Sequence, residues 1–287
     1  MTQALKRIRI LQLPSPNAAK WSEAISEACS REGWQFEIHV PGETPVLDPH
    51  RSSVVLGYND HLPEGEVTDW LVLSNDPDGV ANALTAAGAA LPRHEILYEA
   101  SGRLAAAAVI AARGWPVFSS EAGPLIIPGL GEISILPSGQ QAPQDNWLAL
   151  AVFEDLPVKV GGQATFAPGD FTYPDGDRTR GDGIIPLVGR RRLLLNGPNV
   201  WLPEGRWRFS ARFALDPQDH AELFVEWGFG ASTASYTQMI EHPGTYEIVL
   251  EHVWPELAPA DFRISMMTPA LDGRLEFQGG TLLRLAD

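Results

Sequence analysis

The sequence predicts two domains of different class: a small Rossmann-like or flavodoxin-like α/β domain over residues 1–138, followed by an antiparallel β-sandwich over residues 139–287. Three observations lead to this prediction. The chain of 287 residues exceeds the usual size of one compact domain. Its first half alternates short apolar runs with helical patterns. Its second half holds short strands separated by Gly and Pro turns, with no helical period of any length.

The first half is expected to form a parallel or mixed sheet with helices on its faces. Asn17 opens a helical pattern that ends at Gly33, with apolar residues at the spacing of one helix face. Two more helices are expected from about Pro77 and Arg93, where the composition favours helix. The expected strands are the short apolar runs at residues 8–13, 34–40, 54–57, 70–73 and 116–119.

One polar loop follows an expected strand of this half and contains Asn59, Asp60 and His61. Open α/β sheets bind ligands beyond the carboxyl ends of their strands, so this loop is a candidate binding site. The neighbouring Asp and His could act as an acid/base pair, or they could form an ordinary solvated turn. The chain contains neither GxGxxG nor GxxxxGK followed by Ser or Thr. Binding of a dinucleotide or a nucleoside triphosphate in the usual way is therefore not expected, and no such cofactor is predicted.

The domain boundary is expected near residues 138–145, where Gly, Pro, Ser and Gln become frequent. The clearest strand of the chain lies at residues 207–215, where apolar side chains alternate strictly with Arg and Ser. The Leu-Pro-Glu-Gly before it predicts a tight turn, so residues 193–215 are expected to form strand, turn and strand. Further strands are expected at residues 147–153, 163–166, 184–187, 223–227, 246–250 and 262–266, and at 275–285 with a break at its two glycines.

The second half resembles a known group of domains. The run NGPNVWLPEGRWRFSARFAL, the later FRISMM and the closing RLEFQGGTLLRL are similar to patterns in jelly-roll carbohydrate-binding modules and their galactose-binding-like relatives. The resemblance covers roughly residues 146–287. It implies a jelly-roll sandwich whose partner is a carbohydrate or polysaccharide. Similar domains occur beside bacterial glycosyltransferases, so the resemblance also implies a setting in surface-polysaccharide synthesis.

Sugar recognition needs a flat aromatic face against the C–H side of the ring and planar polar groups for its hydroxyls. Trp201 together with Asn199 is the preferred candidate, because both stand next to an expected turn. Tyr173 and Trp254 are further aromatic candidates outside the clearest core alternation. Each of these aromatic residues could instead fill a core, since the chain has nine Trp and two cores to build.

The acidic segment 170–182 is a candidate cation site. A hard cation such as Ca²⁺ prefers several carboxylate and carbonyl oxygens, and this segment offers four Asp within thirteen residues. Arg178 and Arg180 offset much of that charge, so a turn with local ion pairs is the alternative. The four candidate ligands are Asp170, Asp175, Asp177 and Asp182.

Charge and motif content disfavour several functions. The formal net charge of −15 makes nucleic acid and anionic membranes unexpected partners. The one cysteine, Cys29, excludes an internal disulfide and lies at an apolar helix position, as a buried structural thiol would. No HExxH, CxxC or GxSxG motif is present, which disfavours zinc, thiol and serine-hydrolase chemistry. The first sixteen residues lack a signal-peptide core, so a cytoplasmic location without membrane insertion is expected.

The leading hypothesis is a non-catalytic carbohydrate-binding or polysaccharide-biosynthesis accessory protein. A first alternative is a glycosyltransferase-related enzyme whose α/β half contacts a nucleotide sugar. A second alternative is a structural protein whose sandwich mediates homo-oligomer formation and binds no sugar. The lack of a catalytic motif favours the reading without enzymatic activity.

Overall fold

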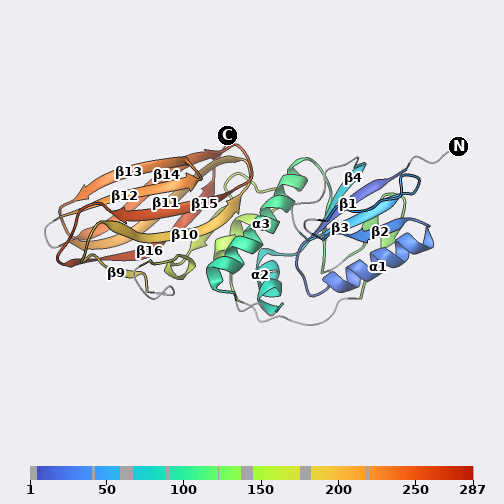
Figure 1. Cartoon of the computed structure of the whole chain (residues 1–287), viewed down its shortest axis with the longest axis horizontal. Coiled ribbons are helices and arrows are strands. Elements are labelled where there is room, and N and C mark those ends of the chain that lie inside the picture. The colour runs from blue at the N-terminus through green and yellow to red at the C-terminus, as the bar shows by residue number, and fades with distance from the viewer. Residues whose placement is uncertain are drawn as a thin grey trace. The chain divides into compact units, whose positions relative to one another are not determined.

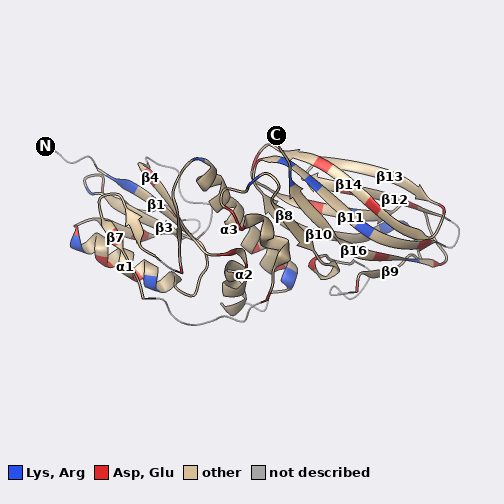
Figure 2. Ribbon diagram, turned by 180° about the vertical axis from the view of Figure 1, so that it is seen from behind, with Lys and Arg blue, Asp and Glu red and all other residues tan. Residues whose placement is uncertain are grey.

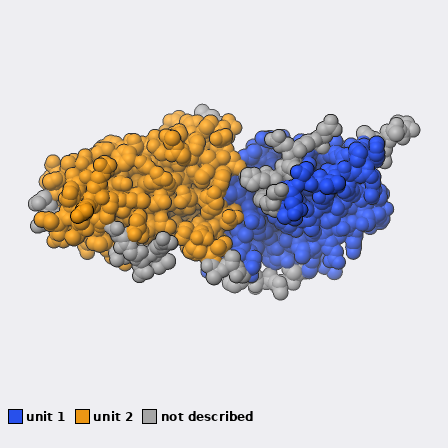
Figure 3. All heavy atoms as spheres, viewed as in Figure 1, with its two compact units in different colours: residues 1–90, 102–146 blue, residues 91–101, 147–287 orange. Residues whose placement is uncertain are grey.

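The computed structural model of the chain (Figure 1) describes residues 5–40, 43–58, 67–87, 91–121, 123–136, 145–174, 182–217 and 220–286. The chain divides into two compact units (Figure 3). Unit 1 comprises residues 1–90 and 102–146, and unit 2 comprises residues 91–101 and 147–287. The boundary predicted between residues 138 and 139 lies outside the described residues. The sequence did not indicate that residues 91–101 group with the second half.

Unit 1 contains five parallel strands in the order β2-β3-β1-β4-β5. The strands are β1 Arg7–Gln12, β2 Gln35–Ile38, β3 Ser53–Gly57, β4 Asp69–Ser74 and β5 Val117–Ser119. The helices are α1 Ala18–Arg31, α2 Pro77–Ala86 and the part of α3 Arg93–Ala112 that follows Ser101. A hairpin follows as β6 Leu125–Ile127 and β7 Gly131–Ile133. The predicted parallel sheet with helices is present. Its strand order is neither the Rossmann order 3-2-1-4-5 nor the flavodoxin order 2-1-3-4-5, so the Rossmann-like part of the prediction is not confirmed.

Local sequence explains where the helices of unit 1 begin and end. The side chain of Asp76 accepts a hydrogen bond from the backbone N–H of Gly79 at 2.6 Å and caps α2, which has Pro77 in its first turn. The chain leaves α1 through Gly33, whose φ of 72° suits a residue without a Cβ. The sequence indicated Gly33 as the end of α1 and Pro77 as the start of α2, but it placed the end of α2 near Leu91, beyond the observed Ala86.

The two faces of the central strand β1 differ in chemistry. Ile8 and Ile10 lie in an apolar core with Trp21 of α1 and Cys29 of the same helix. Burial raises the pKa of the Cys29 thiol to about 12, so it remains protonated and inert, as a structural thiol does. Because side chains alternate along a strand, the neighbouring position Arg9 faces the other side of the sheet.

Unit 2 contains an antiparallel sandwich of two sheets, one ordered β10-β15-β12-β13 and the other β14-β11-β16-β8, with β9 also paired to β16. Its strands are β8 Gln163–Phe166, β9 Ile184–Pro186, β10 Arg192–Leu202, β11 Gly205–Pro217, β12 Ala221–Phe229, β13 Ser232–Ile240, β14 Gly244–Trp254, β15 Ala258–Met266 and β16 Gly273–Arg284. The predicted strand, turn and strand at residues 193–215 are present as β10 and β11.

Three details of unit 2 differ from the expectation. Residues expected as a strand at 147–153 form the 3-10 helix η1 Leu148–Phe153, and a second such turn is η2 Pro168–Asp170. Strand β13 was not predicted, because STASYTQMI shows no alternation of apolar and polar residues. Strand β16 continues through Gly280 instead of breaking there. A Cβ on Gly280 would lie 2.4 Å from the Phe209 ring, so the glycine permits close packing within the strand.

Aromatic side chains fill the space between the two sheets. Such ring pairs each contribute about 0.5–1.5 kcal/mol beyond the area that they bury. Ring centroids lie 4.6–4.8 Å apart in the pairs Trp227/Trp254, Phe171/Phe277 and Phe209/Phe262. Most of the large rings of this half are therefore core residues.

Residues 91–101, the start of α3, complete unit 2. The guanidinium of Arg93 lies 4.1 Å from the ring centroid of Trp147, and its Nε donates to Asp170 Oδ1 at 2.6 Å. The ring of Tyr98 packs on that of Trp201 with a centroid distance of 5.7 Å. A segment from the middle of the first half therefore supplies partners to three residues of the second.

Candidate functional site

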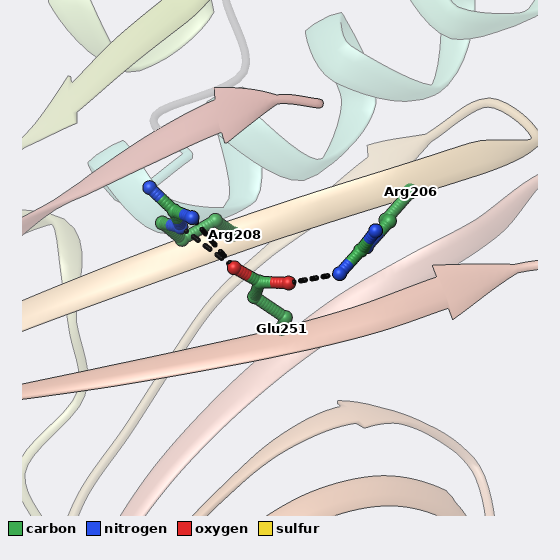
Figure 4. A network of polar contacts seen from close by, with 3 residues as sticks. All are labelled: Arg206, Arg208 and Glu251. Atoms are coloured by element: carbon green, nitrogen blue, oxygen red, sulfur yellow. Dashed lines mark hydrogen bonds and ion pairs between the residues drawn. The ribbon is translucent and has the colours of Figure 1, made fainter. Parts of the chain in front are cut away.

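The strands of the sheet β14-β11-β16-β8 carry both basic and acidic positions, seen as blue and red segments of the ribbon in Figure 2, and its outer face holds a cluster of paired charges. Arg206 and Arg208 of β11 both donate to Glu251 of β14, each with an Nη2–Oε distance of 2.6 Å (Figure 4). Hydrogen bonds from Arg208 and then Arg206 lower the pKa of Glu251. The predicted pairing of outward Arg and Glu residues across the sheet is confirmed at Glu251. No described outward residue of these four strands is aromatic.

The outer face of the other sheet is different. Its register places Asn196 of β10, Arg263 of β15 and Glu226 of β12 side by side, with Ser235 of β13 next in the same row. In the neighbouring row, Phe224 of β12 lies between residues of β15 and β13. We call this surface the Arg263 face; it consists of Asn196, Phe224, Glu226, Ser235, Thr237, Asp261 and Arg263.

Arg263 is the centre of this face and is held by three partners. Its Nε donates to Asn196 Oδ1 at 3.3 Å and its Nη1 to Glu226 Oε1 at 3.0 Å, while Nη2 binds the carboxylate of Asp261. Burial raises the pKa of Asp261, and the guanidinium of Arg263 opposes that shift. The planar fork is thereby fixed in orientation, and the two carboxylates leave this cluster with a net charge of −1.

An aromatic ring and free hydroxyl groups surround the Arg263 cluster. Phe224 is half-buried on the same face, flanked in register by Ser265 and Thr237. Thr237 and Ser235 are exposed, and their hydroxyls make no side-chain hydrogen bond to another described residue. A flat apolar ring thus adjoins amide, carboxylate, guanidinium and hydroxyl groups, which together can contact both the C–H face and the hydroxyls of a sugar.

The preferred sequence candidates lie at one end of the same sheet. Trp201 points outward between buried neighbours of β10, and Tyr98 covers part of its ring. The backbone N–H of Trp201 donates to Ser101 Oγ at 3.0 Å. Asn199 has a φ of 56° and is the extra residue of a β-bulge in β10. Both residues are half-buried, so some of their surface remains accessible.

The other two aromatic candidates are core residues. Tyr173 is buried, and its hydroxyl donates to the carbonyl of Pro168 at 2.9 Å. Burial and the carboxylates of Asp182 and Asp170 raise its pKa. Trp254 is fully buried against Trp227. Trp254 occupies an inward position of β14 and Tyr173 is buried, so neither ring offers a surface on which a sugar could stack.

The acidic segment does not assemble into a cation site within the described residues. Asp170 is buried, bound to Arg93, and accepts a hydrogen bond from the backbone N–H of Ala167 at 2.8 Å, so its carboxylate has a structural role. Asp182 accepts from the backbone N–H of Ile184 at 3.1 Å. No group of three or more His, Cys, Asp or Glu among the described residues could hold a metal ion. The remaining candidates of both loops lie outside the described residues: Asp175, Asp177, Asn59, Asp60 and His61.

Sequence reasoning missed most of the Arg263 face. One of its residues could have been identified from the sequence. Phe224 is an aromatic residue at an outward position of an expected strand, between Glu222 and Glu226. The proximity of Arg263 to Asn196 and Glu226 could not be predicted from the sequence, because it depends on the pairing of β15 with both β10 and β12. Pairing between strands distant in sequence leaves no local pattern.

No protein-family model matches the chain, and no curated protein matches it. Several solved carbohydrate-binding modules resemble part of it. A family 61 module in complex with β-1,4-galactotriose has 15% identity and a TM-score of 0.26, over 31% of this chain and 61% of that one. A CBM36 domain of a multidomain xylanase from the hindgut metagenome of Trinervitermes trinervoides has 12% identity and a TM-score of 0.29, over 44% of this chain and 99% of that one. A CBM22 xylan-binding domain from Paenibacillus barcinonensis has 11% identity and a TM-score of 0.28, over 45% of this chain and 99% of that one.

The resemblance to carbohydrate-binding modules noted in the sequence is thus found again among solved structures. Identity and TM-score are low in all three cases, so the ligand of this chain has to be inferred from its own side chains. Among the described residues, no helix is both long and apolar enough to cross a membrane.

Proposed function

We propose that the protein is a non-catalytic carbohydrate-binding protein and that a glycan lies on the Arg263 face. The observation that carries this proposal is the row Asn196, Arg263 and Glu226 beside the half-buried ring of Phe224. The ring offers an apolar platform for the C–H side of a pyranose. The fixed planar groups and the free hydroxyls of β13 offer donors and acceptors for the sugar hydroxyls.

The contrast between the two outer faces supports this choice of surface. On the opposite face, Arg206 and Arg208 both bind Glu251, and no outward position of the described strands there is aromatic. Exposed ion pairs of this kind contribute little and offer no apolar platform. Only one of the two sheets therefore combines the groups that sugar binding requires.

The arrangement of carboxylates favours binding over hydrolysis. Glycoside hydrolysis requires one carboxyl group as acid and a second as base or nucleophile on either side of the scissile bond. On the Arg263 face, the carboxylates of Glu226 and Asp261 both bind the same guanidinium, so both serve as hydrogen-bond acceptors. The enzyme alternative would need a site elsewhere in the chain.

We further propose that the protein has an accessory role in polysaccharide assembly. The outward positions 233–237 of β13 are Thr, Ser and Thr, a row of hydroxyls roughly 13 Å long by the rise of a strand. That length exceeds one sugar ring, which suits a polymer better than a monosaccharide. This proposal includes the polysaccharide partner and the cytoplasmic location that the sequence led us to expect.

A glycan array followed by calorimetric titration of the best oligosaccharide tests the proposal. We expect Phe224→Ala to weaken binding about fivefold, because a stacked ring contributes about 1 kcal/mol and about 1.4 kcal/mol corresponds to a factor of ten. Arg263→Lys keeps the charge but cannot hold three partners in one plane, so it should weaken binding as well. Circular dichroism would confirm that both variants fold.

The matched control is Arg208→Lys on the opposite outer face, where an exposed Arg also binds a Glu. It should leave glycan affinity unchanged. Equal affinities of the Phe224→Ala, Arg263→Lys and parent proteins would place the glycan elsewhere and refute the assignment of the face. A chain that binds no glycan and self-associates would instead support the structural alternative.

A further inference from the structure

Unit 1 contains a buried arginine that has no hydrogen-bond or ion-pair partner among the described residues. Arg9, on the central strand β1, is 5% exposed, and its Nη1 is inaccessible to solvent and has no hydrogen-bond partner. Among the described residues, Arg9 forms no ion pair; Glu37 of β2 acts on it only as a more distant opposite charge. Arg always carries its charge in proteins, so this group cannot escape burial by losing a proton.

A second arginine accompanies Arg9 on the same side of the sheet. Arg7 stands two residues earlier on β1 and therefore faces the same way. Its Nη1 donates to Ser53 Oγ at 3.3 Å and its Nη2 to the carbonyl of Asp48 at 3.1 Å. Both acceptors are neutral. Burial, and then the charge of Arg7, lower the pKa of Arg9.

Among the described residues, neither Arg9 nor Arg7 forms an ion pair. The carboxylate that acts on Arg9 is that of Glu37, which is separated from Arg9 in the sheet by Val55 of β3. A buried charge is costly unless it is paired and hydrogen-bonded. An anion bound beside Arg9 would supply both the missing charge and the missing acceptors.

We propose that Arg9 and Arg7 form a binding subsite for an oxyanion, namely the carboxylate or phosphate group of a small ligand. Two guanidinium forks on alternate residues of one strand can each present paired N–H groups to such a group. The subsite belongs to the first half of β1, not to the carboxyl ends of the strands where open α/β sheets usually bind ligands. It is independent of the glycan proposed for unit 2.

Thermal unfolding and calorimetric titration of the full chain test the subsite, with inorganic phosphate, glucuronate and uridine diphosphate as probes. At least one probe should raise the unfolding temperature of unit 1. Arg9→Met, which removes the charge and keeps the length of the side chain, should weaken its binding at least tenfold. Without any probe, Arg9→Met should be as stable as the parent chain or more stable, because the unpaired buried charge is gone.

Two further variants make the outcome specific. Arg9→Lys keeps the charge but loses the fork, so it should fold and still bind more weakly. Arg31→Met removes an exposed Arg from the end of α1 and should leave the response unchanged. Tighter binding of phosphate and uridine diphosphate than of glucuronate would identify a phosphate group as the ligand, and the reverse order a carboxylate.

Two results would overturn the proposal. If no probe stabilises the chain and Arg9→Met lowers its stability, Arg9 has a structural role. If the probes stabilise Arg9→Met as much as the parent chain, the oxyanion binds elsewhere.

Discussion

Replacing Arg93 by Met would leave the carboxylate of Asp170 buried without its cation. The Asp170 side chain is 2% exposed, and Arg93 Nε lies 2.6 Å from its Oδ1. Its other oxygen accepts a hydrogen bond from the backbone N–H of Ala167, which Met at position 93 would not disturb. The substitution would also remove the cation–π contact with Trp147 at 4.1 Å.

The expected loss is about 2–3 kcal/mol of unfolding free energy for unit 2. Removing one partner of a fully buried pair costs about 3–5 kcal/mol. Arg93 is itself 39% exposed, so water can approach the carboxylate once the guanidinium is gone, and the loss should fall below that range. The lost cation–π contact adds about 0.5–1 kcal/mol and is included in the expected total.

Urea unfolding followed by circular dichroism and tryptophan fluorescence measures this loss. With a slope of about 2–3 kcal/mol/M, the midpoint of unit 2 should fall by about 1 M. Asp170→Asn in the Arg93→Met background should recover part of the loss, because a neutral amide oxygen can still accept from Ala167. Lys159→Met, which breaks the exposed pair with Asp155, should cost less than about 0.5 kcal/mol. A comparably small loss for Arg93→Met, or no recovery in the double variant, would refute the reasoning.

Two further predictions concern unit 2. Gly280→Ala should destabilise it by about 1–3 kcal/mol, because the added Cβ would lie 2.4 Å from the Phe209 ring; an unchanged urea midpoint would show that the ring can move aside. Burial lowers the pKa of His252 from its ordinary 6.5. Below about pH 6.5 the unfolded chain therefore binds more protons than the folded chain, so the free energy of unfolding decreases as the pH is lowered. His252→Gln should remove that part of the acid-side slope in urea midpoints measured from pH 8 to 5, and an unchanged slope would contradict the assignment.

Elements with a regular local pattern were predictable from the sequence. The helix α1 has apolar residues on one face, and β11 alternates strictly, so both were located within a few residues of their observed ends. Strand β13 was not predictable, since its pairing with β12 and not its own residues determines its conformation. Residues 148–153 are apolar on nearly all sides, so neither a strand nor a helical period identifies their 3-10 turn.

The candidate site was predictable only in part. The aromatic content of the second half pointed to sugar binding, but local sequence could not separate Trp201, which faces outward, from Trp254, which is fully buried. The difference arises from which side of each strand faces the opposite sheet. Likewise, Asp170 resembled a calcium ligand until Arg93, distant in the sequence, was found beside it.

The contribution of residues 91–101 to unit 2 makes the sandwich discontinuous along the gene. A fragment cut at residue 139 would lack Arg93, Tyr98 and Ser101, and it would leave the ring of Trp201 uncovered and Asp170 without its cation. During synthesis, residues 91–101 leave the ribosome before any strand of the sandwich. Their contacts with Trp147, Asp170 and Trp201 can therefore form only after the second half has been synthesised. A gene fragment that begins at the predicted domain boundary would therefore encode an incomplete sandwich.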